Sequence, residues 1–184
     1  MNRCQWAEGN EILKQYHDIE WGVCVYDDVK LFEILNLECM QAGLSWLIVL
    51  KKRNSYKIAF DHWNYKLIEK YDENKISLLM NNVEIIRSLN KIKAIIMNAK
   101  AFIEIQNEFE TFSNYIWQFV NNKQIVNNYE TINQVPAYSD LSNKISLDLK
   151  KRGFKYTGKT RIYSFLQACG IINDHIDKCD FKIK

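Results

Sequence analysis

The sequence has little of what usually interrupts helices. Its 184 residues include one proline, Pro136, and six glycines. Long stretches instead place apolar residues three and four positions apart. Proline removes a backbone donor and glycine is entropically costly inside a helix, so their scarcity favours helices over a chain of turns and short strands. We therefore expect an all-α protein.

Two further absences narrow the class of protein. No segment approaches the roughly 20 consecutive apolar residues that cross a bilayer, and no secretory signal is recognisable. The five cysteines are an odd number, which argues against a disulfide framework and for a reducing compartment. We expect a cytoplasmic protein with no membrane association.

No repeat, linker or low-complexity stretch divides the chain. A length of 184 residues is enough for a substantial core. We expect one domain over residues 1–184, built around a single core or as two small helical lobes that share one cleft. The net charge of +3 and pI near 8.5 permit binding to a polyanion without requiring it, because such a charge reports on non-specific attraction.

Apolar spacing and capping residues predict where the helices lie. A short hairpin is also expected, in which a segment from Val83 to Leu89 meets the following helix at a tight turn containing Asn90, a residue that tolerates a left-handed backbone. The chain should break at Gly43. The longer helices are expected after Asp27 or Asp28 as far as Cys39, from Ser45 to Phe60, around Ile92–Ile103, over Leu141–Leu149, and from about Lys159 to Cys169.

Two cysteine and histidine pairs lie at opposite ends of the chain. Cys4 and His17 are near the N-terminus, and His175 and Cys179 are near the C-terminus, spaced i and i+4. Two cysteines and two histidines form one of the commonest structural zinc sites. These four residues predict a Zn²⁺ site that joins the two terminal segments. On spacing alone, buried thiols and surface imidazoles remain an equally good interpretation.

A single acidic residue, Glu38, interrupts the apolar stretch from Leu35 to Met40. Burial of a carboxylate is costly unless something pairs with it. Its partner would be a protein group, a metal, or a ligand that carries donors or positive charge. The plainer alternative is a half-exposed glutamate on an amphipathic helix.

Several motifs together resemble one family, the bacterial 3-methyladenine DNA glycosylase I family. They occur in the same order and cover nearly the whole chain, from Cys4 to Cys179. The matching segments are Tyr16–Gly22, Glu38–Trp46, Leu50–Arg53, Ile85–Arg87, Lys150–Lys155, Tyr163–Gly170 and Asn173–His175.

The resemblance implies a helix-hairpin-helix DNA glycosylase fold with zinc between its termini. It implies a monofunctional enzyme that flips 3-methyladenine out of alkylated double-stranded DNA and excises it by hydrolysis. Glu38 would recognise the base and carry the catalytic role, in a pocket with Tyr16 and Trp46, and Trp6 and Trp21 would be weaker members of that pocket. Gly43 and Leu44 would form a wedge in the DNA, although a helix break with a buried leucine is an equally good interpretation of the sequence. Apart from the resemblance, the turn ending at Lys91 can present the amides of the following helix to a phosphate, as helix N-termini do.

Two positions depart from the pattern of this family, because Leu13 and Asn90 stand where many members have tyrosine and glycine. Other functions also remain open from sequence. A zinc-clasped helical module could bind damaged DNA without cleaving it, and a remote third possibility is an enzyme acting on a free cationic heterocycle. Only the glycosylase would release a free methylated base. We expect a monomer.

Overall fold

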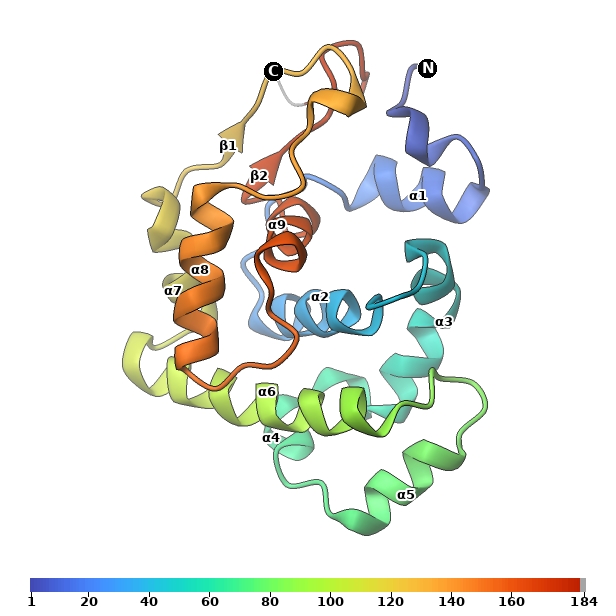
Figure 1. Ribbon diagram of the computed structural model, residues 1–184, viewed down its shortest axis with the longest axis vertical. Helices are drawn as coiled ribbons and strands as arrows, with labels where there is room; N and C mark the ends of the chain where they lie inside the picture. Colours follow the sequence, from blue (N-terminus) through green and yellow to red (C-terminus); the bar gives the residue numbers. More distant parts are fainter. Residues whose placement is uncertain (183–184) are drawn as a thin grey trace.

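The computed structural model describes residues 1–182, and within them helices dominate, as expected (Figure 1). The only strands assigned in that range, β1 and β2, are two residues long and pair in parallel. The elements, with η for 3₁₀ helices, are η1 (Gln5–Ala7), α1 (Glu11–Ile19), α2 (Asp28–Met40), α3 (Trp46–Ala59), η2 (Asp61–Trp63), α4 (Tyr65–Ile68), α5 (Glu73–Asn81), α6 (Leu89–Phe109), α7 (Phe112–Trp117), η3 (Gln118–Val120), β1 (Ile125–Val126), η4 (Ile132–Gln134), α8 (Asp140–Lys151), α9 (Lys159–Ala168) and β2 (Ile172–Asn173).

Helix α2 lies at the centre of the molecule and contacts α6, α7 and α9 (Figure 1). Its start agrees with the prediction, because the Asp27 carboxylate accepts a hydrogen bond from the Lys30 N–H. Every residue from Leu31 to Met40 is buried. A helix surrounded by protein on all sides has no solvent face, so the polar groups of α2 must find partners inside the protein or in a ligand.

The hairpin differs from the prediction. Residues 82–88, which include most of the segment expected to be helical, form an irregular connection between α5 and α6. Side chains from α3 form hydrogen bonds with backbone groups of this connection. The Ile86 N–H donates to the Tyr56 hydroxyl, and the Lys52 ammonium donates to the Glu84 carbonyl. Asn90 lies inside α6 and has no left-handed backbone. The predicted turn is therefore wrong in detail, although two helices do meet there.

The other predicted helices are confirmed. Helices α3, α6, α8 and α9 cover the expected residues, and α9 ends before Gly170, which has a φ of +70°. A Cβ at Gly170 would lie 2.2 Å from the Val23 backbone. Only glycine permits this contact between the end of α9 and the N-terminal segment.

The two terminal segments of the described chain meet, and both termini lie at the top of the molecule in Figure 1. The Asp180 N–H donates to the Asn2 carbonyl, and the Asn2 N–H donates to the Asp180 carboxylate at 2.8 Å. This arrangement brings α1 next to the residues that follow β2. Among residues 1–182, no helix is long and apolar enough to cross a membrane.

Candidate active site

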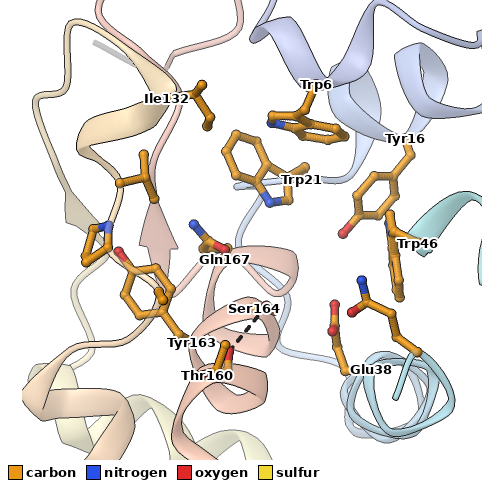
Figure 2. A pocket seen from close by; sticks show the side chains of 14 residues that line it. Trp6, Tyr16, Trp21, Glu38, Trp46, Ile132, Thr160, Tyr163, Ser164 and Gln167 are labelled. Atoms are coloured by element: carbon orange, nitrogen blue, oxygen red, sulfur yellow. Dashed lines mark hydrogen bonds between the residues drawn. The ribbon is translucent and has the colours of Figure 1, made fainter. Parts of the chain in front are cut away.

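A cavity of about 340 Å³ opens between the N-terminal segment, the junction of α2 with α3, and α9. Figure 2 shows Glu38 on one side of this cavity and the side chains of α9 on the other. Its size suits a small organic group. The lining residues are Trp6, Tyr16, Trp21, Glu38, Gln41, Trp46, Ile132, Val135, Pro136, Ala137, Thr160, Tyr163, Ser164 and Gln167.

Glu38 lies in the last turn of α2 and is only 4% exposed. Its Oε2 atom is buried without a hydrogen-bond partner. Burial raises the pKa of Glu38 to about 8, although Arg161 opposes the rise. The alternative that Glu38 is a half-exposed residue of an amphipathic helix is therefore wrong. Its carboxyl group is buried and can bind a partner that enters the cavity.

Aromatic rings form the wall nearest to Glu38. The Tyr16 and Trp46 rings meet edge to face with centroids 5.4 Å apart, and Trp6 and Trp21 do so at 5.1 Å. The Trp46 Nε1 atom is buried without a partner. Burial, followed by the nearby Glu38, raises the pKa of Tyr16 well above its ordinary value, so its hydroxyl remains a donor. All five residues predicted to bind a base therefore line one cavity.

Two cations, Lys91 and Arg161, lie at the C-terminal end of α2 near Glu38, but both bind main-chain carbonyl groups. Lys91 is 8% exposed, and its Nζ donates to the carbonyls of Met40 and Ala42 at 2.8 and 2.7 Å. Arg161 Nη1 donates to the Glu38 carbonyl at 2.9 Å. The Lys91 ammonium therefore supports the backbone below the cavity instead of facing solvent. The predicted phosphate contact concerns the backbone amides at the start of α6 and stays a prediction.

The connection between α2 and α3 contains Gly43 and Leu44. Gly43 is exposed with a φ of +79°, and a Cβ built there would meet no atom within 4 Å. Leu44 is half-buried. The chain does break at Gly43, as predicted, and Lys91 fixes the start of this connection through the Ala42 carbonyl.

The four residues predicted to bind metal come together although they lie at opposite ends of the sequence. All are buried, and their ligand atoms lie within 4.8 Å of one another. His175 Nδ1 is 3.2 Å from Cys179 Sγ and 3.8 Å from Cys4 Sγ, while His17 Nε2 is 3.5 Å from Cys179 Sγ. Zinc–ligand bonds of about 2.3 Å to sulfur and 2.0 Å to nitrogen place neighbouring ligands of a tetrahedron about 3.5 Å apart. The measured distances fit that geometry.

The surroundings of the histidine rings also suit a metal. His17 Nδ1 lies 2.8 Å from the Asp18 carboxylate, and His175 Nε2 lies 2.9 Å from the Trp21 carbonyl. Such partners fix the tautomer that leaves the other ring nitrogen free to bind. Burial lowers the pKa of His175 to about 4 and also lowers that of His17. Both rings are thus neutral, which is the form that binds metal.

Sequence reasoning missed the side of the cavity opposite Glu38. Helix α9 contributes Thr160, Tyr163, Ser164 and Gln167, and residues 132–137 cover them. The sequence motif Tyr163–Gly170 contains two of these residues besides Gln167 but does not by itself indicate a role for them. A helical repeat of polar side chains at 160, 164 and 167 was the available signal.

Comparisons with known proteins all point to one family. A family model described as methyladenine glycosylase matches residues 6–183. The chain is 42% identical to DNA-3-methyladenine glycosylase 1 of Escherichia coli strain K12, over 97% of this chain and 96% of that protein. It is 44% identical to DNA-3-methyladenine glycosylase of Haemophilus influenzae, over 98% and 97% of the two chains.

A solved structure is also similar. It is that of 3-methyladenine DNA glycosylase I from Staphylococcus aureus, determined to show the structural basis of 3-methyladenine recognition. It superposes with a TM-score of 0.96 at 34% identity and covers 100% of this chain and 98% of its own.

Proposed function

Because this chain belongs to the methyladenine glycosylase family, we propose that it excises 3-methyladenine from alkylated DNA by hydrolysis of the glycosidic bond. The observation that carries the proposal is the buried, unpartnered Glu38 carboxyl group, which faces a cavity walled by Tyr16 and Trp46. A carboxylate and π faces both favour a positively charged ligand over a neutral one.

The chemistry of the substrate matches these walls. A base attacked by an enzyme must leave the duplex at a cost of a few kcal/mol. Stacking on Tyr16 and Trp46 returns about 1–3 kcal/mol per base, and the positive charge of a methylated base adds about 0.5–2 kcal/mol. Glu38 accepts hydrogen bonds from the purine edge. Unmodified adenine is neutral, gains less from each contact and is a poorer leaving group.

Replacement of Glu38 tests this proposal. We expect Glu38→Gln and Glu38→Ala to lower the release of 3-methyladenine from methylated duplex DNA by roughly 100-fold, the loss expected of one buried charge-assisted contact. Glu104→Gln, which changes an exposed carboxylate on α6, is the matched control. Full activity of the Glu38 variants would refute the role, and wild-type protein that releases no base would refute the function.

The proposal extends to how DNA is held. Helices α5 and α6 with residues 82–88 would serve as the hairpin of a helix-hairpin-helix glycosylase, and Leu44 would enter the gap left by the flipped base. An apolar wedge stabilises distorted DNA in this way. Leu44→Ala should weaken binding to a duplex with an abasic site more than binding to an intact duplex. Equal losses on both duplexes would count against the wedge.

We further propose that Cys4, His17, His175 and Cys179 hold one structural Zn²⁺. The buried cluster fits a tetrahedron, and burial raises the pKa of Cys4 to about 12, so a thiolate there requires a neighbouring cation such as zinc. The metal would join the two terminal segments. Trp6, Tyr16 and Trp21 are carried by the N-terminal segment and would be held against the cavity by this link.

Metal analysis tests the site directly. Cys4→Ala and Cys179→Ala should each lower the zinc content and the thermal stability. Cys24→Ala removes a half-buried cysteine outside the cluster and should leave the zinc content unchanged. Purified wild-type protein that contains no zinc and is unaffected by a chelator would contradict this assignment.

A further inference from the structure

Helix α9 turns a polar stripe toward the cavity, on the side opposite Glu38 (Figure 2). Thr160, Ser164 and Gln167 are spaced i, i+4 and i+7, which places them on one face. The proposed recognition of the base involves Glu38 and the aromatic rings but none of these three side chains. They line the part of the cavity that lies away from the proposed base site.

Behind this stripe lies a second buried carboxylate, Asp174, which is 0% exposed. It accepts three hydrogen bonds from neutral donors, namely Asn127 Nδ2 at 2.7 Å, the Tyr163 hydroxyl at 2.6 Å and Gln167 Nε2 at 2.7 Å. Within residues 1–182 no cation contacts this carboxylate. Two of the three donors, Tyr163 and Gln167, also line the cavity.

The contact with Asp174 fixes the direction of the Gln167 amide. If the amide were turned over, its oxygen would face a carboxylate oxygen 2.7 Å away, an arrangement of two acceptors with no proton between them. The nitrogen must therefore face Asp174. Figure 2 shows the Gln167 amide between Trp21 and Tyr163, with its oxygen turned toward the side on which Glu38 lies. The cavity thus contains a preset acceptor opposite the proposed base site.

We propose that Gln167 Oε1 holds the attacking water, and that Asp174 is the positioning residue that orients it. The inference rests on the proposed glycosylase function and deepens it. In the reaction, the bond from N9 to C1′ breaks and its electron pair leaves with neutral 3-methyladenine. The water oxygen bonds to C1′ of the cationic sugar. One water proton is released to solvent, and the product is an abasic site.

An amide acceptor suits this reaction. The positively charged base leaves readily, so the protein needs no strong base to create hydroxide, and a water that is oriented toward C1′ is enough. The Gln167 oxygen accepts a hydrogen bond from that water, and the negative charge of Asp174 polarises the amide from behind. The cavity opens to solvent, which takes the proton.

The test compares the same substitution at two glutamines. Gln167→Met should lower the single-turnover rate on methylated DNA by roughly 100-fold, the loss typical of a misplaced reactant, with unchanged affinity for free 3-methyladenine. Gln124→Met is the control, because Gln124 Nε2 donates to the carbonyls of Gly22 and Gly170 outside the cavity lining. The control should lose stability but retain the rate.

Methanol provides a readout that a structural role would not change. Methanol competes with water for the cationic sugar and gives a methyl glycoside in place of the abasic site. A held water favours hydrolysis, so Gln167→Met should raise the ratio of methyl glycoside to abasic product several-fold. Gln167→Asn, which keeps an amide but withdraws it by one methylene, should raise the ratio too.

The outcomes separate the two claims. If the wild-type protein releases base while Gln167→Met is as fast, or has the same product ratio as Gln124→Met, the role of Gln167 is overturned and the glycosylase function stands. If the wild-type protein binds 3-methyladenine but releases none from DNA, the function itself fails and this inference fails with it.

Discussion

The two ends of α2 treat a buried carboxylate in opposite ways. Glu33 in the first half of the helix meets Arg53 Nε at 2.7 Å and Lys30 Nζ at 3.2 Å. Glu38 in the last turn has a buried oxygen without any partner. Cations are available at this end too, but Lys91 and Arg161 bind main-chain carbonyls.

This difference distinguishes a structural carboxylate from a functional one. Glu33 is paired with Arg53, and the same arginine also binds Glu20 through both oxygens at 2.7 and 2.8 Å. The Glu38 carboxyl group lacks a partner until a ligand binds. A buried carboxyl group without a partner is unfavourable, because it must either carry an unpaired charge or take up a proton. Its position beside an open cavity is what the proposed role of Glu38 in substrate binding requires.

The largest effect is expected from Arg53→Met, which removes the cation from the paired end. Glu20 and Glu33, both partly buried, would keep only their contacts with Lys30 at 3.1 and 3.2 Å. We expect a loss of about 3 kcal/mol, the lower end of the range for breaking a buried ion pair. Urea unfolding measures the loss, and the activity of the folded fraction should not change. Lys30→Met, which removes a more exposed contact, should cost less than about 1 kcal/mol. Equal losses of unfolding free energy in Arg53→Met and Lys30→Met would show that Arg53 is no more important to the paired carboxylates than the more exposed Lys30.

Glu38→Gln, in contrast to Arg53→Met, should stabilise the protein relative to wild type near neutral pH. The pKa of Glu38 is raised from 4.5 to about 8 in the folded protein, so the unfolded chain loses this proton first as the pH rises. Wild-type stability then falls between pH 5 and pH 7 relative to the variant, by about 2 kcal/mol. The difference in unfolding free energy between the two proteins isolates this group. A difference that does not depend on pH would mean that Glu38 is not buried as a neutral acid.

The same pKa sets the pH dependence of activity. A cationic base favours the carboxylate form, so binding below pH 8 requires Glu38 to release its proton. We expect kcat/KM on methylated DNA to rise about tenfold per pH unit up to about pH 8 and then to level. Glu38→Gln should give a flat profile at a lower rate. A wild-type profile that is also flat would show that the ionisation of Glu38 is not part of recognition.

Local signals made much of the fold predictable. Asp27 begins α2 and Gly170 follows α9, because capping and a left-handed backbone depend on neighbours in sequence. The apolar neighbours of Glu38 raised the question of its burial without deciding it, and the structure shows that the side chain is buried. The meeting of Cys4 with Cys179 was a hypothesis about the donor set, and the structure brings them together.

What could not be predicted depends on distant partners. Residues 82–88 remain irregular because Tyr56 and Lys52 on α3 supply their hydrogen bonds. Lys91 turns inward because the end of α2 presents free carbonyls. The orientation of Gln167 depends on Asp174, whose carboxylate is also held by the distant Asn127 that follows β1.

Replacement of Arg161 should have the smallest effect, a shift in the pH midpoint of the kcat/KM profile. Its charge lowers the pKa of Glu38 although burial dominates and raises it overall. Because Arg161 donates to the Glu38 carbonyl and not to the carboxylate, Arg161→Met should move the midpoint of the kcat/KM profile upward by about one unit or less. Arg161→Lys should retain most of the wild-type midpoint. A downward shift in Arg161→Met would mean that this cation does not act on Glu38 through its charge, and the unpaired end of α2 would need another explanation.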